Sequence, residues 1–227
     1  SINLPGIKSR PNVKSNKGYA LCSFFSKQET EIIHNFVSNE GGNLFTCLLA
    51  TWNILFYRYT SQKDILLGTS ILEEIDSDIE NSNDVYGNTV LFREELEPFE
   101  SFNSFYHRIT KSQLLDYKNQ PYSIDQLVTD LDIITDKRRN SIFDIMVTFN
   151  KKANKFDDIR NLFTTSNNII DLGEKISKFD MEISFHEMED FLYFDIAYNT
   201  DVYDRDIIEN LIIHYKTLLS ALIAQPT

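Results

Sequence analysis

Residues 43–72 read NLFTCLLATWNILFYRYTSQKDILLGTSIL. In the first half, apolar residues at positions i, i+1, i+4, i+5, i+8, i+11, i+12 and i+15 form one wide stripe along a helix from Leu44 to Tyr59. Asn43 occupies the expected N-cap position of that helix. The second half, from Asp64 to Leu72, is an apolar run between polar residues and predicts a buried strand. A long apolar helix followed by a buried strand favours helices packed on a sheet.

A second helix with the same apolar offsets is predicted at the end of the chain, beginning at Asp204. Near the start, Ser26 and Glu29 have the spacing of a capping box and predict another helix, which Gly41 and Gly42 end. Two further helices are expected, one carrying Phe102, Phe105, Tyr106 and Ile109 and one following Pro121 with Ile124, Leu127, Val128 and Leu131. Strands are expected at 19–25, 88–96 and 142–149, with a hairpin of 179–185 and 191–198 around the tip 186–190.

These segments predict an α/β (α+β) two-layer fold with a mixed β-sheet flanked by helices. The expected order is strand, two helices, two strands, two helices, strand, an optional strand, two strands and a helix. Residues 150–177 are too polar to assign beyond that optional strand, and the acidic stretch 73–84 suits an exposed loop better than a calcium site, which would need a glycine at its turn. Residues 1–18 predict an entry segment or linker, and 19–224 a single domain.

Composition excludes several classes of function. The 227 residues carry 22 Lys and Arg against 34 Asp and Glu, a net charge of −12, which argues against binding nucleic acid or an anionic membrane surface. No run reaches the ~18 consecutive apolar residues of a membrane helix, and because residues 1–10 carry no apolar h-region, no signal peptide is expected. The two cysteines, Cys22 and Cys47, lie among apolar residues and are expected to be buried free thiols. A cytoplasmic location fits these features.

No familiar catalytic motif is present. The sequence lacks a phosphate-binding glycine loop, a paired-cysteine metal site and a Gly-x-Ser-x-Gly elbow. His34, His107 and His214 are interpreted as helix-flanking residues, and no metal ligands or catalytic residues are assigned. His186 begins a His-x-x-x-Asp string that resembles the base of histidine-dependent acyltransferases, but an acidic turn at the hairpin tip explains it better.

Five strings in register nevertheless point to a family. They are 43–72, YGNTVLFR at 86–93, NQPYSIDQLVTDL at 119–131, RNSIFDIMVTFN at 139–150, and YNTDVYD at 198–204 followed by a helix. Together they resemble the C-terminal lobe of a condensation domain of nonribosomal peptide synthetases. Departures from the family's pattern include Gly87, Asn119, Ser123 and Ser141, and they put the tunnel-facing geometry in doubt more than the fold.

The resemblance implies half of a two-lobed enzyme in which each lobe has the chloramphenicol acetyltransferase fold. The active-site tunnel lies between the lobes, and the reaction joins an acyl or peptidyl group on one carrier protein to an amine on another. Both substrates arrive as thioesters on phosphopantetheine arms, so no cofactor is expected to bind the lobe directly. The His-His-x-x-x-Asp-Gly string of the family's N-terminal lobe is missing here.

By the same resemblance, Asn88 and Arg93 match positions near the tunnel, although capping and solvent-facing roles are open alternatives. Structural roles are expected for the other matched positions, which are Arg139, Asp144, Met146, Tyr198, Asn199 and Asp201.

The favoured hypothesis is a C-terminal lobe that forms one tunnel wall and is inactive alone. The expected partners are the N-terminal condensation lobe, carrier proteins and neighbouring synthetase domains, and an exposed apolar face would allow the isolated lobe to self-associate. The first alternative is a non-catalytic module that docks a carrier or a partner subunit. The second is a self-associating acyltransferase that uses His186 across a subunit interface.

Overall fold

The computed structural model describes residues 1–70, 89–118, 122–133, 136–140, 142–151, 169–189 and 191–226. The elements are β1 Lys17–Phe24, α1 Lys27–Glu40, α2 Leu44–Thr60, β2 Asp64–Ser70, β3 Thr89–Glu95, α3 Phe102–Lys118, α4 Ile124–Asp130, β4 Ile145–Lys151, β5 Ile169–Ile176, β6 Met181–Glu187, β7 Leu192–Asn199 and α6 Arg205–Ala224. This order confirms the predicted one, and β5 is the optional strand. The acidic loop predicted at 73–84 lies outside the described residues.

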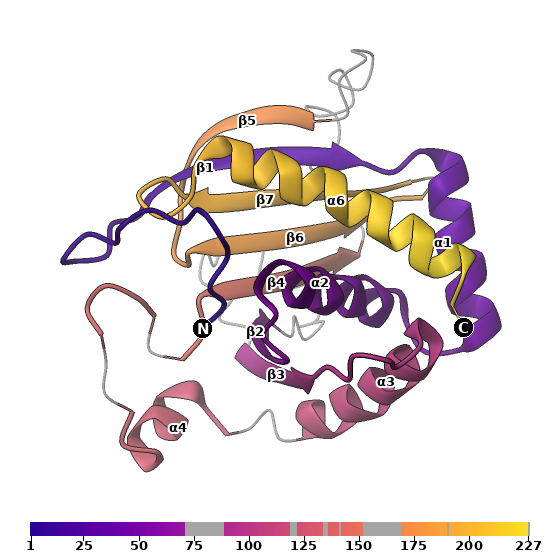
Figure 1. Ribbon diagram of the computed structural model, residues 1–227, viewed down its shortest axis with the longest axis horizontal. Coiled ribbons are helices and arrows are strands. Elements are labelled where there is room, and N and C mark those ends of the chain that lie inside the picture. The colour runs from indigo at the N-terminus through magenta and orange to yellow at the C-terminus, as the bar shows by residue number, and fades with distance from the viewer. Residues whose placement is uncertain are drawn as a thin grey trace, which may run out of the picture.

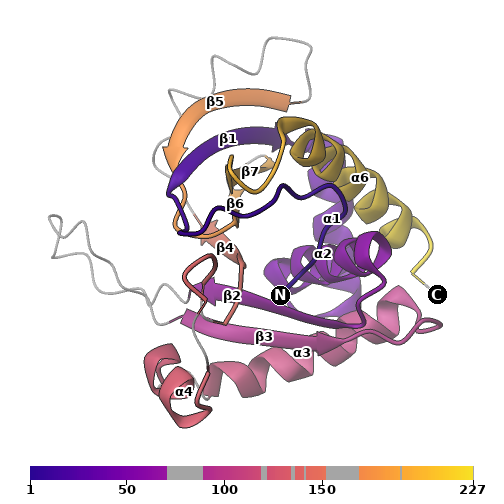
Figure 2. The same cartoon turned by 60° about the vertical axis from the view of Figure 1, so that its left-hand side comes forward.

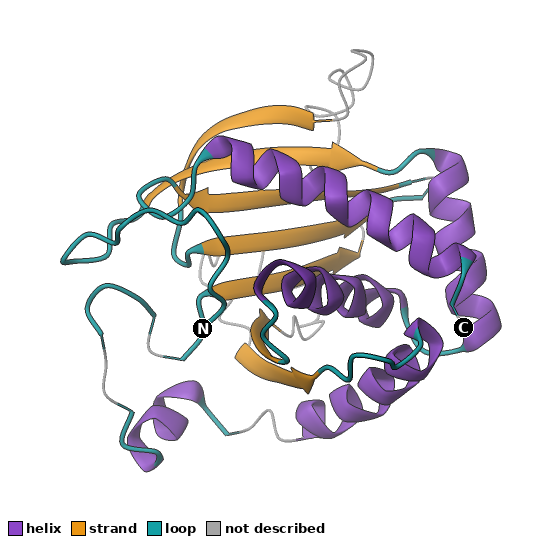
Figure 3. Cartoon of the chain, in the orientation of Figure 1, coloured by secondary structure: helices purple, strands orange, loops and turns teal. Residues whose placement is uncertain are grey.

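The strands form one mixed sheet with helices on one of its faces. The strand order is β3-β2-β4-β6-β7-β1-β5. β4 runs parallel to both β2 and β6, and the other neighbouring pairs are antiparallel. Helices α1, α2 and α6 cover one face, and α3 packs on α2 and β3 (Figures 1 and 2). The predicted α/β two-layer architecture is therefore confirmed (Figure 3).

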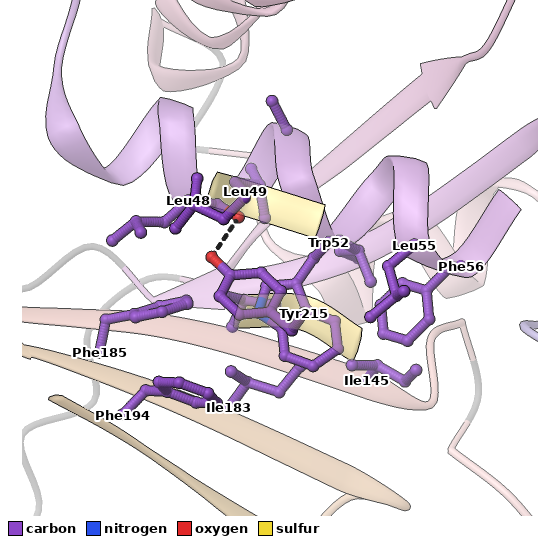
Figure 4. Packing of buried hydrophobic residues seen from close by; sticks show 14 of the residues in the cluster. Leu48, Leu49, Trp52, Leu55, Phe56, Ile145, Ile183, Phe185, Phe194 and Tyr215 are labelled. Atoms are coloured by element: carbon purple, nitrogen blue, oxygen red, sulfur yellow. Dashed lines mark hydrogen bonds between the residues drawn. The ribbon is translucent and has the colours of Figure 1, made fainter. Parts of the chain in front are cut away.

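The core lies between the sheet and the two long helices whose apolar stripes the sequence predicted. The Trp52 ring of α2 stacks on Tyr215 of α6 with ring centroids 4.4 Å apart. The Tyr215 hydroxyl donates a hydrogen bond of 3.0 Å to the Leu48 carbonyl, so this buried polar group is satisfied (Figure 4). Phe185 and Phe194 pack against Tyr215 from the sheet. Each fully buried aromatic of this kind contributes about 1.5–3 kcal/mol.

Helix caps explain where two of the helices begin. Ser26 and Glu29 form the predicted capping box at α1. The side chain of Asn43 accepts hydrogen bonds from the Thr46 amide at 2.8 Å and the Thr46 hydroxyl at 3.0 Å. Asp204 occupies the N-cap position of α6 but makes no side-chain cap hydrogen bond.

The two N-caps give a matched pair of substitutions. Asn43→Ala should lower the free energy of unfolding by about 1 kcal/mol, because it removes an acceptor from the first turn of α2. Asp204→Ala should cost less, because that side chain caps no backbone amide. Urea unfolding of both variants measures the difference in the free energy of unfolding. An equal decrease at the two positions would contradict the assignment of Asn43 as a residue that stabilises its helix by N-capping.

The start of β4 differs from the predicted one. β4 begins at Ile145 rather than Ile142, because its pairing with β6 starts there, opposite Met181. The entry segment before β1 packs on the body of the lobe, with Ile2 and Leu4 in the main core. The predicted division at residue 18 remains a prediction about domains.

His186 does not lie in a hairpin tip. The predicted hairpin is confirmed as the antiparallel pair β6 and β7, but the pairing continues to Glu187 and Leu192, which places His186 inside β6 opposite Tyr193. The expected acidic turn at His186 is therefore wrong. The alternating polar residues before Glu187 extend the strand, and the chain reverses only beyond it.

Helix α6 has the length and composition of a membrane span. It is an amphipathic core helix in this fold, because Ile208, Leu211, Ile212, Tyr215, Leu218 and Leu219 are buried along one side.

Candidate functional site

The sheet presents a second face, away from the helix layer. On β4, Ile145 and Val147 belong to the core beneath the helices. Because successive strand residues point to opposite faces, Met146 and Thr148 lie on the other face. Of the described helices, none covers the central strands β4, β6 and β7 on that side (Figure 2). We call this surface the open face of the sheet.

Strand register arranges the open-face residues of β4, β6 and β7 in rows. The rows are Met146–Glu182–Ala197, Thr148–Ser184–Asp195 and Asn150–His186–Tyr193. Five of the six residues in the second and third rows are polar, and all six lie at the middle of a seven-stranded sheet. Tyr193 and Asp195 are buried and the other four residues are half-buried, so these rows form a partly shielded polar surface.

Side chains in these rows bind one another. The Thr148 hydroxyl donates to the Ser184 hydroxyl at 3.1 Å. His186 Nε2 lies 2.9 Å from an Asp195 carboxylate oxygen, and Lys175 Nζ lies 3.4 Å from the other. The His186 ring stacks on Tyr193, with centroids 4.3 Å apart and planes at 9°. The open face is therefore an ordered polar network.

Glu182 adds an acidic group to the first row. Burial raises the pKa of its carboxyl, and the nearby Asp195 carboxylate raises it further. Its strand neighbours on this face, Met146 and Ala197, are uncharged, and Lys175 and Lys178 offset the rise only in part. The Glu182 carboxyl therefore takes up a proton at a higher pH than the carboxyl of an exposed glutamate does.

A buried charged cluster lies where β4 and β6 begin. Arg10 from the entry segment pairs with Asp180, whose side chain is fully buried. Arg139 lies 3.8 Å from Asp144 across the same cluster. Burial, followed by the neighbouring Asp180 charge, raises the pKa of the Asp144 carboxyl. One oxygen on each of these two carboxylates is shielded from solvent without a hydrogen-bond partner among the described residues.

The turn after β7 ties the entry segment to the sheet. Asn199 donates from its side-chain amide to the Ser15 carbonyl at 2.6 Å and accepts from the Asp201 amide at 2.9 Å. The Ser15 hydroxyl donates to Asp201 at 2.6 Å. Tyr198 faces the helix layer and belongs to the main core. These contacts give the YNTD string a local structural explanation.

The structure brings together most of the residues singled out in the sequence. Arg139, Asp144, Asn199 and Asp201 lie around the start of β4 and β6 and the end of β7, and Met146 follows them onto the open face. Arg93 lies apart on the edge strand β3, 72% exposed, where its guanidinium donates to both Asp64 oxygens at 2.9 and 2.7 Å. Asn88 lies outside the described residues. Tunnel-facing roles for Asn88 and Arg93 remain predictions.

Sequence reasoning missed the residues that define the site. The alternation in MEISFHE at 181–187 was a usable signal, because Glu182, Ser184 and His186 must share the face opposite the apolar residues. Arg10 had no such signal, since an arginine in a polar entry segment normally faces solvent.

Each described histidine has a polar side chain as its neighbour. His186 contacts Asp195 through Nε2, and its Nδ1 is shielded from solvent. His34 and His107 lie 3.6 and 3.4 Å from Glu187 and Glu40. His214 Nδ1 lies 2.6 Å from the Tyr59 hydroxyl, beside a cavity of about 550 Å³ between α2 and α6. Over the described ranges, no group of three His, Cys, Asp or Glu side chains is placed to hold a metal ion.

Both thiols are shielded, which predicts low reactivity. Cys22 lies on the open-face side of β1 and Cys47 inside α2, and both are fully buried. Burial raises the pKa of the Cys22 thiol well above its usual range and that of Cys47 to about 12. A disulfide reagent at pH 8 should therefore react with the folded chain at least about 100-fold more slowly than with the urea-unfolded chain. Fast reaction of either thiol in the folded protein would contradict this burial.

The comparisons with known proteins identify one family. The family model of the condensation domain matches residues 1–227. Over 226 residues the chain is 29% identical to tyrocidine synthase 3 of Brevibacillus parabrevis, covering 100% of this chain and 3% of that protein. Gramicidin S synthase 2 of Brevibacillus brevis is 27% identical over 225 residues, covering 99% of this chain and 5% of the relative. The chain thus spans a small part of either relative.

Solved structures share the fold. A four-domain nonribosomal peptide synthetase bound to AMP and glycine superposes with a TM-score of 0.81 at 18% identity, covering all of this chain and 18% of that one. The X-domain from teicoplanin biosynthesis gives 0.83 at 15% identity, covering all of this chain and 51% of the X-domain chain. A complex of that X-domain with OxyB gives 0.80 at 14% identity, with 100% and 49% coverage.

Proposed function

Since the chain belongs to the condensation-domain family, we propose that it is the C-terminal lobe of a peptide-bond-forming condensation domain of a nonribosomal peptide synthetase. The lobe contributes one wall of a tunnel in which a carrier-bound donor thioester meets the amine of a carrier-bound acceptor. Phosphopantetheine arms of the carriers deliver both substrates, and the chain needs no cofactor of its own. The expected setting is the cytoplasm, beside the other domains of a synthetase.

The polar centre of the open face carries this proposal. Thr148, Ser184 and Asp195 sit on the central strands, where a sheet that is covered on both faces would carry apolar residues. A polar wall of this kind fits a hydrated passage bounded on its far side by another lobe. The helix layer already fills the opposite face.

Two further observations support a single lobe. The chain matches about half of the teicoplanin X-domain while all of its own length superposes. The sequence contains no pair of adjacent histidines, and its four histidines are scattered. Both observations support a reaction in which a second lobe supplies the histidine base.

An acyl-transfer assay with donor and acceptor carriers loaded with aminoacyl thioesters tests the proposal. The isolated chain should give no peptide product above the carrier-only background. Adding a separate N-terminal condensation lobe with the His-His-x-x-x-Asp-Gly string should produce peptide. Robust turnover by the isolated 227-residue chain would overturn the lobe assignment.

A docking module is the second candidate function. The X-domain has the same fold and has been solved in complex with OxyB, so a condensation-type fold can serve to bind a partner protein. Titration with apo and loaded carriers separates the two functions. Carrier binding that persists while the two-lobe mixture makes no product would favour docking. Sedimentation of the isolated chain tests the predicted self-association.

A further inference from the structure

A cavity of about 330 Å³ lies between the start of β3, the end of α3 and the short helix α4. Its lining consists of Thr89, Val90, Leu91, Asp116, Tyr122, Ile124 and Leu127. Four of these seven side chains are aliphatic, and Asp116 is the one charged group among them. The volume is at the small end of the range for ligand pockets, so it suits a compact molecule.

Asp116 is poorly compensated. Its Oδ2 is shielded from solvent and has no hydrogen-bond partner in the part of the chain that the structure describes. Burial raises the pKa of this carboxyl. A carboxylate in an apolar wall without a counter-charge is unfavourable, so any cation that reaches it gains a strong interaction.

Among the described residues, the arginine nearest to Asp116 along α3 pairs with other carboxylates. Arg108, two turns earlier on α3, donates to Glu94 at 3.2 Å and to Glu100 at 2.9 Å. Glu94 itself is almost fully buried, and the Asp116 charge contributes to raising its pKa. Arg108 therefore pairs with Glu94 and Glu100 rather than with Asp116.

Apolar side chains beside Asp116 are also exposed. None of the α4 residues is buried. Ile124 and Leu127 turn toward the cavity, and Tyr122 at its rim is 46% exposed. The rest of the fold leaves these apolar side chains partly exposed. The hydrocarbon part of a ligand in the cavity could cover them.

We propose that this cavity binds a small apolar primary ammonium compound, of the alkyl- or arylalkylammonium class. The ammonium group donates charge-assisted hydrogen bonds to Asp116, and the hydrocarbon part packs on Val90, Ile124 and Leu127. The site lies at the edge strand β3, which three strands separate from β7 in the sheet order. It goes beyond the proposed tunnel wall and does not depend on it.

Calorimetric titration of the full chain with phenethylammonium chloride at pH 7.5 tests the proposal, with 2-phenylethanol as the neutral analogue of the same size. The ammonium probe should bind, and the alcohol should bind at least tenfold more weakly. Asp116→Asn should reduce the affinity for the ammonium at least tenfold, because it keeps the shape and removes the charge. Leu127→Trp, which fills the cavity, should abolish binding of both probes.

Asp125→Asn is the matched control, since Asp125 is an exposed residue of α4 that does not line the cavity. This variant should bind like the parent chain. Thermal unfolding monitored by circular dichroism verifies that each variant is folded. No binding of phenethylammonium at millimolar concentration, equal binding of the alcohol, or equal losses in Asp116→Asn and Asp125→Asn would overturn the proposal. None of these readouts involves carriers or acyl transfer, so they stand apart from the proposed function.

Discussion

Replacing Arg10 by methionine should lower the free energy of unfolding by about 3–5 kcal/mol. The side chain of Arg10 is 9% exposed and that of its partner Asp180 is fully buried. Arg10→Met therefore leaves a buried carboxylate without its counter-charge, next to the second buried carboxylate of Asp144. Urea unfolding monitored by circular dichroism measures the loss.

Two companion variants make this test specific to burial. Arg138→Met removes an arginine from a pair with Asp136 whose side chains are 55% and 38% exposed, and it should cost at most about 1 kcal/mol. The double change Arg10→Met with Asp180→Leu removes both charges and should recover much of the stability. Equal effects of Arg10→Met and Arg138→Met would contradict the role given to the buried pair.

Replacing Ser184 by tryptophan should reduce peptide formation by the two-lobe mixture at least about 100-fold. Ser184 stands in the central row of the open face, between Thr148 and Asp195. A bulky ring there would protrude into the passage that the proposed function requires. Ser184 is half-buried and bonded to Thr148 but lies outside the helix-side core, so the free energy of unfolding should fall by about 1–3 kcal/mol and the chain should remain folded, which circular dichroism checks.

Glu31→Trp is the control for Ser184→Trp. It introduces the same side chain at an exposed position of α1, on the helix layer. Peptide formation should remain at the parent level in this variant. If Ser184→Trp retained full activity, or if Glu31→Trp lost as much, the open face would not be the wall of the tunnel.

The order of the elements could be predicted because each of them has a local signal. The helical stripe of residues 44–59, the capping box at Ser26 and the N-cap Asn43 all act within a few residues, and the structure confirms each of them. Apolar alternation likewise predicted the β6–β7 hairpin.

The candidate site could not be predicted, because it is formed by contacts between residues far apart in the sequence. Arg10 meets Asp180 from 170 positions away, and nothing in a polar entry segment indicates such a partner. The tip of the hairpin was misplaced at His186 because acidic residues normally favour turns, whereas here strand pairing continues to Glu187. The polar rows appear only when the register of three strands is known.

Thiol labelling of a Ser184→Cys variant tests most directly whether a second lobe covers the open face. Cys22 and Cys47 are buried with raised thiol pKa values, so the new thiol should provide the fast signal. A maleimide reagent should label Cys at position 184 quickly in the isolated chain, and an N-terminal condensation lobe should slow that labelling at least tenfold. Glu31→Cys, on the helix layer, should label at the same rate with and without the lobe. Unchanged labelling at position 184 in a mixture that makes peptide, or protection at position 31 instead, would contradict the account.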